Sequence, residues 1–336
     1  MAYSAAILAR AKARLAAARE QNAQDDAARI GAIYERLPRL RQIDLELQKT
    51  AAKVCAAAFR AGEDPSETIR QLKDENLRLQ QERDWILESE GVAPDDLEQT
   101  AVCPRCGGSG YLGARMCECL AELCRQEQKK ELSSLLGAGR ESFERFRLDY
   151  YPAEYDPDLG TSPREIMKKV YERAVRYAQS FAPGARSLLF SGATGLGKTF
   201  LSACIARTVA DRGYSVCYVS AEALFADFEQ QKFRPREGED VTRKYLACDL
   251  LILDDLGTEM TTQFTIAALY QVVNTRLMES RATIVSTNLP VGELDRRYSA
   301  QIASRLLGAY TLYKFSGKDI RMLQKSMARP TEDMNR

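Results

Sequence analysis

The C-terminal half of the chain alternates short apolar runs with longer amphipathic segments. Helical patterns cover Glu165–Phe181, Thr199–Asp211 and Phe264–Glu279. Five apolar runs of strand length separate or flank them, at 187–192, 215–220, 250–255, 282–288 and 311–316. Strands that alternate with amphipathic helices build a parallel sheet with helices on both faces. The pattern therefore predicts an α/β domain around a parallel five-stranded sheet.

The N-terminal part has a helical pattern instead. From about residue 24 to residue 90 it predicts two helices, interrupted at 61–65 by a segment that contains Gly62 and Pro65. Each helix has one apolar stripe: Leu40, Ile43, Leu47 and Val54 on the first, and Ile69, Leu72, Leu79 and Ile86 on the second. We expect the two helices to pack as an antiparallel hairpin. The pattern fits a self-contained structural hairpin and a docking arm for a partner equally well.

A complete G-x-x-x-x-G-K-[ST] motif lies between the apolar run at 187–192 and the helix near Thr199. Its glycines let the backbone wrap tightly, so that successive N–H groups and the positive end of a helix dipole face a phosphate chain. Lys198 adds a charge at the β and γ phosphates, and Thr199 offers a hydroxyl to Mg²⁺. The predicted nucleotide-binding residues of this loop are Gly192, Ala193, Thr194, Gly195, Leu196, Gly197, Lys198 and Thr199.

Polar residues end two of the predicted buried strands. Leu250–Leu253 lead into Asp254 and Asp255, at the edge where open α/β sheets bind ligands. We expect Asp254 to hold Mg²⁺ and Asp255 to orient or deprotonate the attacking water. Asn288 ends the run at 282–288 and is predicted to position water near the γ phosphate. The alternative for these residues is a turn that only ends a strand.

Five of the nine cysteines lie between Cys103 and Cys124. Cys103 and Cys106 form a C-x-x-C pair, and Cys117 and Cys119 form a C-x-C pair. Four thiolates in a glycine-rich segment fit tetrahedral Zn²⁺, and a closed set of four is structural rather than catalytic. Because the chain has no histidine, we expect these four cysteines to form an all-cysteine zinc site unless a carboxylate joins, and Cys124 is an alternative ligand because the C-x-C pair is tight. Unligated thiols are the alternative.

The overall composition restricts the class of protein but does not indicate a function. The 336 residues are 45% hydrophobic and 28% charged, as in soluble globular proteins, and no run approaches the roughly 18 apolar residues of a membrane helix. The net charge of +1 means that nucleic-acid binding would need a local basic patch. Clustered cysteines favour a metal site in a reducing compartment. We expect a cytoplasmic protein with no membrane partner.

Several segments together resemble the helicase-loader and transposition-helper branch of the AAA+ ATPases, the DnaC, DnaI and IstB-like proteins. They are GATGLGKT at 192–199, LLILDDLGTE at 250–259, STNL at 286–289, ASRL at 303–306 and GKDIR at 317–321. The resemblance covers roughly residues 140–322 and implies a P-loop AAA+ core that lacks a full helical lid. The helical arm and the CPxC…CxC segment look like the front end of DnaC-like ATP-binding proteins from Gram-positive bacteria and their phages.

The resemblance also assigns roles to three polar residues. Arg305 looks like the arginine finger that reaches the ATP of a neighbouring subunit, and Arg321 looks like a sensor-2 arginine that reads the phosphates in its own subunit. Asn288 resembles the sensor-1 element. Most AAA+ proteins have Glu where this chain has Asp255, which is one methylene shorter. We therefore expect a slow ATPase that DNA or a partner stimulates.

The domain order that we expect follows from these assignments. Residues 1–95 form a helical arm, 100–130 a four-cysteine zinc module, 131–165 a linker, 166–322 the AAA+ ATPase domain and 323–336 a flexible tail. The resemblance implies a bacterial or phage-encoded, ATP-dependent loader of the hexameric replicative DNA helicase, which binds ATP, Mg²⁺ and single-stranded DNA and forms a homo-oligomer through Arg305. The alternatives are an IstB-like transposition helper and a nucleotide-gated adaptor with little hydrolysis.

Overall fold

The chain forms two compact units. The computed structural model describes residues 3–58, 66–135, 141–235 and 240–327. The smaller unit comprises Ala13–Cys119, and the larger unit comprises Met1–Lys12 with Leu120–Arg336. Each unit has its own hydrophobic core, and each is described by itself below.

The larger unit is built around a sheet of five parallel strands. In spatial order they are β4 (Val216–Ser220), β5 (Leu250–Leu256), β6 (Ala282–Thr287), β3 (Leu188–Ser191) and β7 (Thr311–Lys314). Each strand coincides with one of the five predicted runs to within one or two residues, so the predicted parallel five-stranded sheet is confirmed. Because the strands are parallel, all their C-terminal ends lie at one edge of the sheet, where such sheets bind ligands.

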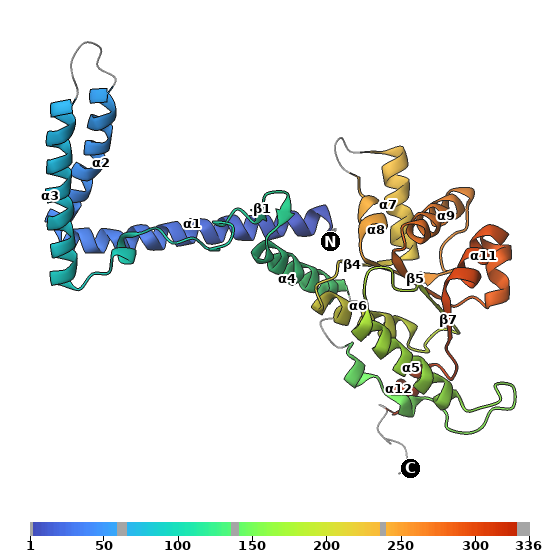
Figure 1. The fold of residues 1–336 in the computed structure, drawn as a ribbon. Coiled ribbons are helices and arrows are strands. Elements are labelled where there is room, and N and C mark those ends of the chain that lie inside the picture. Colours follow the sequence, from blue (N-terminus) through green and yellow to red (C-terminus); the bar gives the residue numbers. More distant parts are fainter. Residues whose placement is uncertain (1–2, 59–65, 136–140, 236–239, 328–336) are drawn as a thin grey trace, which may run out of the picture. The chain divides into compact units, whose positions relative to one another are not determined.

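Helices cover both faces of this sheet (Figure 1). One face packs against α5 (Pro163–Ser180) and α6 (Lys198–Asp211). The other packs against α7 (Ala221–Phe233), α8 (Arg243–Ala247), α9 (Gln263–Met278), α10 (Leu294–Arg297) and α11 (Ala300–Ala309). The strands are apolar on both sides because successive side chains enter opposite cores, as Leu188 and Leu189 do.

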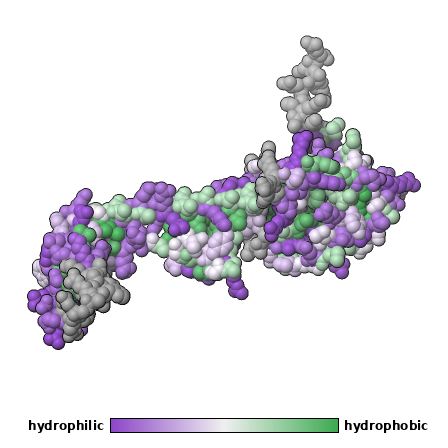
Figure 2. Space-filling model, turned by 90° about the horizontal axis from the view of Figure 1, so that it is seen from above, coloured by the Kyte–Doolittle hydropathy of each residue, from purple (hydrophilic) through white to green (hydrophobic). Residues whose placement is uncertain are grey.

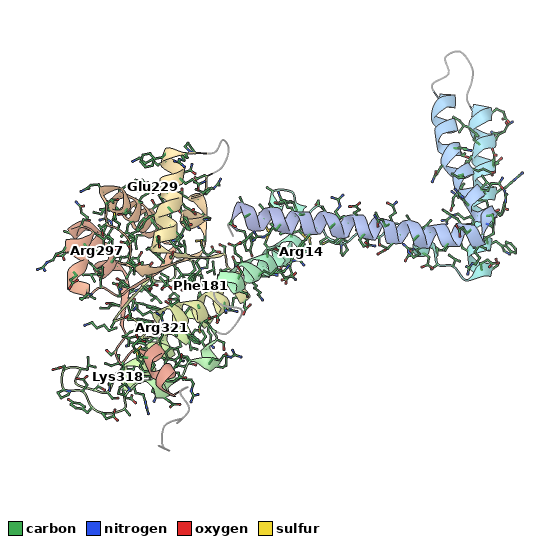
Figure 3. All side chains as sticks on the ribbon, turned by 180° about the vertical axis from the view of Figure 1, so that it is seen from behind. Arg14, Phe181, Glu229, Arg297, Lys318 and Arg321 are labelled. Carbon is green, nitrogen blue, oxygen red and sulfur yellow. The ribbon has the colours of Figure 1, made fainter. Side chains whose placement is uncertain are left out.

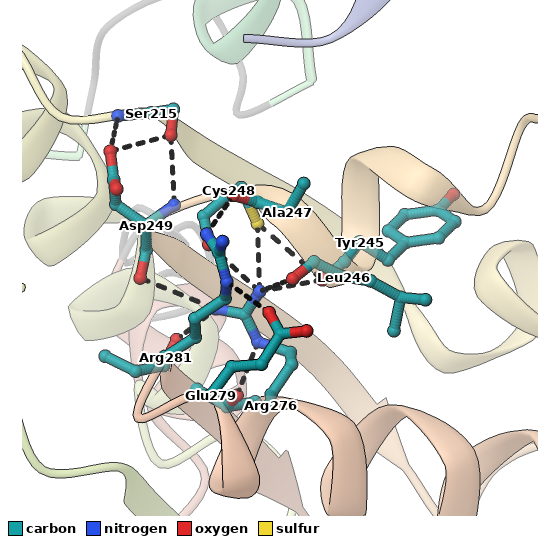
Figure 4. A network of polar contacts seen from close by, with 11 residues as sticks. Ser215, Tyr245, Leu246, Ala247, Cys248, Asp249, Arg276, Glu279 and Arg281 are labelled. Carbon is teal, nitrogen blue, oxygen red and sulfur yellow. Dashed lines mark hydrogen bonds and ion pairs between the residues drawn. The ribbon is translucent and has the colours of Figure 1, made fainter. Parts of the chain in front are cut away.

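A fully buried arginine ties α9 to the N-terminal end of β5 (Figure 4). The Nη1 atom of Arg276 donates to the carbonyl oxygens of Tyr245 and Cys248 at 2.8 and 3.0 Å. Its Nη2 donates to the Ala282 carbonyl oxygen at 2.6 Å, and its Nε donates to Thr283 Oγ1 at 2.9 Å. A buried charge is tolerated when such hydrogen bonds replace water. This network stabilises the sheet at the edge opposite the strand C-termini.

A glutamine side chain completes the edge strand β4. Gln128 lies on α4 (Glu118–Leu135) and is buried. Its Nε2 donates to the Tyr214 carbonyl oxygen at 2.8 Å, and its Oε1 accepts from the Val216 amide at 3.0 Å. The side-chain amide therefore satisfies backbone groups that an open sheet edge would leave unpaired.

The smaller unit contains most of α1 (Ala5–Arg36), together with α2 (Pro38–Ala58) and α3 (Ser66–Glu90). Leu40 and Ile43 of α2 pack with Leu79 and Ile86 of α3 in a small core. The sequence predicted one helix from residue 24 to the break, but the structure divides it at Leu37. Proline has no N–H and fits the first turn of a helix, which explains why α2 starts at residue 38. The predicted break at 61–65 lies outside the described residues.

Short elements complete the fold. They are η1 (Pro94–Leu97), β1 (Tyr111–Leu112), β2 (Arg115–Met116), η2 (Phe143–Arg145), η3 (Leu148–Tyr150), η4 (Val291–Glu293) and α12 (Ile320–Met327). The predicted tail from residue 323 thus begins inside a helix. Hydrophilic and apolar residues are interspersed on the face in Figure 2, and no helix in the described ranges is both long and apolar enough to span a bilayer.

Candidate functional site

The loop between β3 and α6 has the backbone that a phosphate cradle needs. Gly192, Gly195 and Gly197 have φ angles of 155°, 75° and 87°, which side chains rarely allow. A Cβ atom on Gly192 would approach the Phe315 carbonyl oxygen to 2.6 Å, so this position excludes a larger residue. Because α6 begins directly after the loop, its unpaired N–H groups and positive dipole end face the same space. The loop is therefore built to bind an anion.

Lys198, the first residue of α6, is folded back into this loop. Its Nζ donates to the carbonyl oxygens of Gly192 at 2.7 Å and Ala193 at 2.8 Å, and only 5% of the residue is exposed. Burial lowers the pKa of Lys198, while the carboxylates of Asp255 and Asp254 act in the opposite direction. Among the residues that the structure describes, carbonyl oxygens alone hold this ammonium group, and no carboxylate contacts it directly. It is therefore available to pair with a phosphate.

Two carboxylates project from β5 at the same edge of the sheet. Asp254 is buried and accepts hydrogen bonds from Tyr218 Oη at 2.6 Å and from Ser286 Oγ. Asp255 has a φ of 54°, which is uncommon for a residue other than glycine, and its amide donates to Ser286 Oγ at 3.0 Å. Desolvation, and then the Asp254 carboxylate, raise the pKa of Asp255. The first carboxylate is fixed by neutral donors, and the raised pKa makes the second a better proton acceptor than an ordinary Asp side chain.

Asn288 follows β6 and faces the same space. Its Oδ1 atom is buried and has no hydrogen-bond partner among the residues that the structure describes. Such an atom is destabilising unless water or a ligand binds it. Its position suits a group that orients a water molecule or a phosphate oxygen.

These residues line one cavity of about 580 Å³. The predicted residues in its wall are Thr194, Gly195, Leu196, Gly197, Lys198, Thr199, Asp254, Asp255, Asn288 and Arg321. Arg321 comes from α12, near Lys318 (Figure 3). Gly192 and Ala193 are not in the wall, although both hold Lys198 through their carbonyl oxygens. The volume is typical of a site for a small organic ligand.

One wall of the cavity was not predicted. Residues in 141–151 line it, including Phe146, Tyr150 and Tyr151, although the sequence had assigned this segment to a linker. The ring of Phe146 stacks on that of Tyr151 with centroids 5.9 Å apart, and on that of Tyr171 at 5.2 Å. The only sequence signal was the density of aromatic and basic residues in FERFRLDYY at 143–151. No local motif connects that run to the P-loop.

Two hydrogen bonds attach the cavity walls to the P-loop. The Tyr151 hydroxyl donates to the Leu196 carbonyl oxygen at 2.8 Å, and burial raises the pKa of Tyr151. The Ile320 amide, at the start of α12, donates to the Gly195 carbonyl oxygen at 2.9 Å. The segment before the sheet and the helix after it are therefore both fixed to the phosphate cradle.

Arg305 lies outside this cavity. It is half-buried on α11, where its guanidinium group contacts Tyr270 and Asn274 of α9. Among the sequence-predicted site residues of the larger unit, it is the one that does not gather around the P-loop.

Four cysteines of the smaller unit form a separate cluster. The Sγ atoms of Cys103, Cys106, Cys117 and Cys119 all lie within 4.8 Å of one another. Two of these pairs are 3.9 Å apart (Cys103 and Cys117) and 3.5 Å apart (Cys106 and Cys119). Tetrahedral zinc with Zn–S bonds of about 2.3 Å places its sulfur ligands roughly 3.8 Å apart. The four sulfur atoms therefore fit a zinc ion.

The backbone around the cluster supports metal binding. Strands β1 and β2 form a small hairpin between the two cysteine pairs, and the Gly110 amide donates to Cys106 Sγ at 3.3 Å. Although desolvation opposes it, this amide and the neighbouring thiols lower the pKa of Cys106 to about 6, whereas desolvation and the contact with Cys106 raise the pKa of Cys119. A lower pKa favours the thiolate, which is the form that binds metals. Cys124, the suggested substitute ligand, is buried in α4 and is not a member of the group.

Comparison with known proteins agrees with the P-loop assignment. Residues 167–327 match the family described as IstB-like ATP binding protein. The replicative helicase loader DnaC of Buchnera aphidicola subsp. Acyrthosiphon pisum (strain APS) is 24% identical over 172 residues, which are 50% of this chain and 66% of that protein. The loader DnaC of Escherichia coli (strain K12) is 25% identical over 135 residues, which are 40% of this chain and 55% of that protein.

A solved structure of the DnaC helicase loader aligns with a TM-score of 0.43 at 18% identity, and the alignment covers 52% of this chain and 98% of that chain. The matches to the two curated relatives span 66% and 55% of their own lengths. The resemblance to the DnaC and IstB-like branch is confirmed by the family match and these relatives. Residues 167–327 match this IstB-like family, and their complete P-loop and parallel five-stranded sheet have the P-loop AAA+ fold.

Proposed function

We propose that this chain is an ATPase that loads the hexameric replicative DNA helicase onto DNA. One observation carries the ATPase part: the glycine-rich cradle with Lys198, the carboxylates of Asp254 and Asp255, and the unpaired Oδ1 of Asn288 all line one cavity. The names of the DnaC relatives support the loading part. Binding, hydrolysis and partner recognition are treated separately below.

The phosphates of ATP bind at the N-terminus of α6. The N–H groups of the loop and the Lys198 ammonium supply positive charge, and Arg321 contacts the phosphates from α12. Thr199 and Asp254 are the residues that would hold Mg²⁺, because a hydroxyl and a carboxylate at this edge are hard oxygen ligands. The ion, when bound, neutralises phosphate charge. The aromatic residues Phe146 and Tyr150 offer the base a face to stack on.

Hydrolysis depends on two residues at the strand ends. Asp255 accepts a proton from the attacking water or orients it, and its raised pKa suits a proton acceptor. Asn288 orients the same water through its free Oδ1. Asp255 is shorter than the Glu that is usual in AAA+ proteins, and for this reason we expect slow turnover that DNA or the helicase stimulates.

The active site is completed by a neighbouring subunit. Arg305 lies outside its own cavity and serves as the arginine finger of the next subunit in a homo-oligomer. A mixing experiment tests this role. Lys198→Ala chains and Arg305→Ala chains, each inactive alone, should regain ATP turnover when mixed, because a mixed interface combines an intact P-loop with an intact Arg305. No recovery at any ratio would argue against action between subunits.

An aromatic pair with one exposed member supports binding of single-stranded DNA. Phe233 at the end of α7 is 63% exposed, and its ring centroid lies 5.9 Å from that of Phe264. Lys232 Nζ lies 5.5 and 5.2 Å from these two centroids. Aromatic faces beside cations bind single strands by stacking, at about 1–3 kcal/mol per base. Phe233→Ala should therefore weaken oligo(dT) binding roughly tenfold by fluorescence anisotropy, whereas Tyr155→Ala, at another exposed aromatic residue, should not.

The cysteine cluster holds a structural zinc ion. The spacing of its four sulfur atoms is the supporting observation. A closed set of four cysteine ligands has no open position for substrate, so zinc stabilises this part of the smaller unit rather than taking part in hydrolysis.

A reconstituted loading reaction tests the proposed function. The replicative helicase of the same genome is given forked DNA coated with single-strand binding protein, and unwinding is measured with wild-type chain or with Lys198→Ala. Unwinding that needs the wild-type chain and ATP is the expected result. Stable capture of the transposase and not of the helicase would instead indicate an IstB-like transposition helper. Absence of phosphate release with DNA and helicase present would indicate a nucleotide-gated adaptor, the alternative that Asp255 favours.

A further inference from the structure

Arg305 is held by side chains of a neighbouring helix in its own subunit. Its Nε donates to Asn274 Oδ1 at 3.0 Å, and its Nη2 donates to Tyr270 Oη at 2.9 Å. The guanidinium carbon also lies 4.6 Å from the centroid of the Tyr270 ring, a cation–π distance. A further bond joins Nη1 to the carbonyl oxygen of Gln301, one turn earlier on α11, at 3.3 Å. These contacts define the plane in which the guanidinium lies.

The remaining N–H donors of Arg305 lie on its two terminal nitrogens. A guanidinium has five N–H donors, and three of them are used in these bonds. One N–H on Nη1 and one on Nη2 are left without a partner in the described part of the chain. Donors that remain on both terminal nitrogens leave Arg305 able to bind phosphate oxygens while Tyr270 and Asn274 hold it.

The groups that hold Arg305 are all neutral. They are a phenol hydroxyl, a side-chain amide and a backbone carbonyl, and no carboxylate within the described ranges forms an ion pair with this arginine. An anionic partner would satisfy the guanidinium charge within the subunit. Neutral acceptors orient the group and leave its charge available for a ligand outside the subunit.

We propose that Tyr270 and Asn274 are positioning residues for Arg305. They hold its guanidinium in the orientation that a neighbouring subunit's nucleotide requires, and the neutrality of Asn274 is part of that role. The inference rests on the proposed function of Arg305 as a trans-acting finger. It adds that two residues of α9 set the orientation of Arg305 and thereby the rate of ATP hydrolysis.

The Asn274→Asp variant distinguishes two roles for the contact between Asn274 and Arg305: orienting the guanidinium for catalysis, or only attaching α11 to α9. The new carboxylate would form an ion pair with Arg305, so a purely structural contact would be retained or strengthened and Tm would stay the same or rise. Positioning predicts the opposite effect on catalysis: kcat for ATP should fall roughly tenfold or more, with little change in KM, because the finger is neutralised within its own subunit. The matched control is Gln271→Asp, which places the same charge on an exposed position of α9.

Tyr270→Phe tests the second contact. It keeps the ring face and removes the hydroxyl acceptor, so kcat should fall several-fold to about tenfold without loss of nucleotide binding. All variants are assayed as full chains with Mg²⁺, ATP and single-stranded DNA, beside Arg305→Ala. If Arg305→Ala abolishes turnover while Asn274→Asp and Tyr270→Phe retain wild-type kcat, the positioning role is wrong and the trans finger stands. If Arg305→Ala itself has wild-type turnover, both the finger and its positioning are overturned.

Discussion

The buried hydroxyl of Tyr151 donates to the carbonyl oxygen of Leu196, and so joins a segment far upstream to the centre of the P-loop. The phosphate cradle is therefore not held by its own glycines alone. The same tyrosine contacts the turn that leads into α12, since a Cβ on Gly317 would lie 3.0 Å from its ring. One side chain thus supports both the cradle and the helix that carries Arg321.

Tyr151→Phe should destabilise the larger unit and weaken nucleotide binding. The ring stays, but the buried carbonyl oxygen of Leu196 loses its donor, and such a loss is worth about 1–3 kcal/mol. Tm and the Kd for ADP are the measurements. Tyr155→Phe is the matched control, because Tyr155 is 69% exposed. Equal values for the two variants would mean that the bond does not support the P-loop.

Asp255 should control turnover and not affinity. Asp255→Asn removes the proton acceptor, so kcat should fall by about 10²–10⁴ while ATP still binds. Asp255→Glu introduces the longer carboxylate side chain that most AAA+ proteins have at this position. ATP turnover of this variant should equal or exceed that of the wild type. Phosphate release and equilibrium ATP binding give the two quantities. A Glu variant as inactive as the Asn variant would contradict the role given to this carboxylate.

The cysteine cluster should release one zinc ion per chain. Treatment with a thiol-modifying mercurial in the presence of a colorimetric zinc indicator measures the stoichiometry. Cys106→Ser should lose the metal, because it removes one of four ligands, whereas Cys124→Ser should keep it, since Cys124 is outside the group. ATP binding should persist in Cys106→Ser, because the P-loop belongs to the other unit. Zinc retained by Cys106→Ser and lost by Cys124→Ser would reassign the ligands.

Asp26 should make the smaller unit sensitive to acid. The hydrogen bond from Arg29, and then those from Thr100, lower the pKa of Asp26. A lowered pKa contributes stability above the ordinary value of about 3.9, and this contribution is lost as pH falls through the folded pKa. The urea midpoint of Asp26→Asn should therefore lie below that of the wild type at neutral pH.

The difference between these two proteins should shrink as pH falls below about 3.9 and vanish once the pH has passed the lowered pKa of Asp26 in the folded protein. Fluorescence of Trp85, the single tryptophan, reports on α3 of the same unit. Comparing the two proteins at each pH cancels the effect of acid on other groups. A constant difference down to about pH 3 would show that the Asp26 charge does not matter.

The P-loop and the strands could be predicted because their signals are local. The motif at Gly192–Thr199 specifies both the glycine-rich backbone and the lysine charge within eight consecutive residues. Strands that are buried on both faces appear in the sequence as continuous apolar runs, such as Leu250–Leu253. The polar residues after these runs could be placed at one edge because parallel strands end together.

Long-range relationships could not be predicted. Nothing near Phe146 or Tyr151 indicates that they contact residues some 50 positions later, because tertiary packing alone brings them to the P-loop. The contacts of Arg305 with Tyr270 likewise depend on how α11 packs against α9. The helix break at Leu37 was not predicted for a different reason. The helical spacing of apolar residues continues across Pro38, so the pattern indicated one continuous helix although a proline is present.

The central claim is that the loop around Lys198 binds the phosphates of ATP. Titration of the full chain with a fluorescent ATP analogue and Mg²⁺, beside Lys198→Ala and the exposed control Lys169→Ala, tests it most directly. We predict saturable binding by the wild type and by Lys169→Ala, and a Kd about 10- to 100-fold higher for Lys198→Ala, as expected for loss of a charge-assisted contact. Binding of equal strength by Lys198→Ala, or no binding by the wild type, would contradict the account.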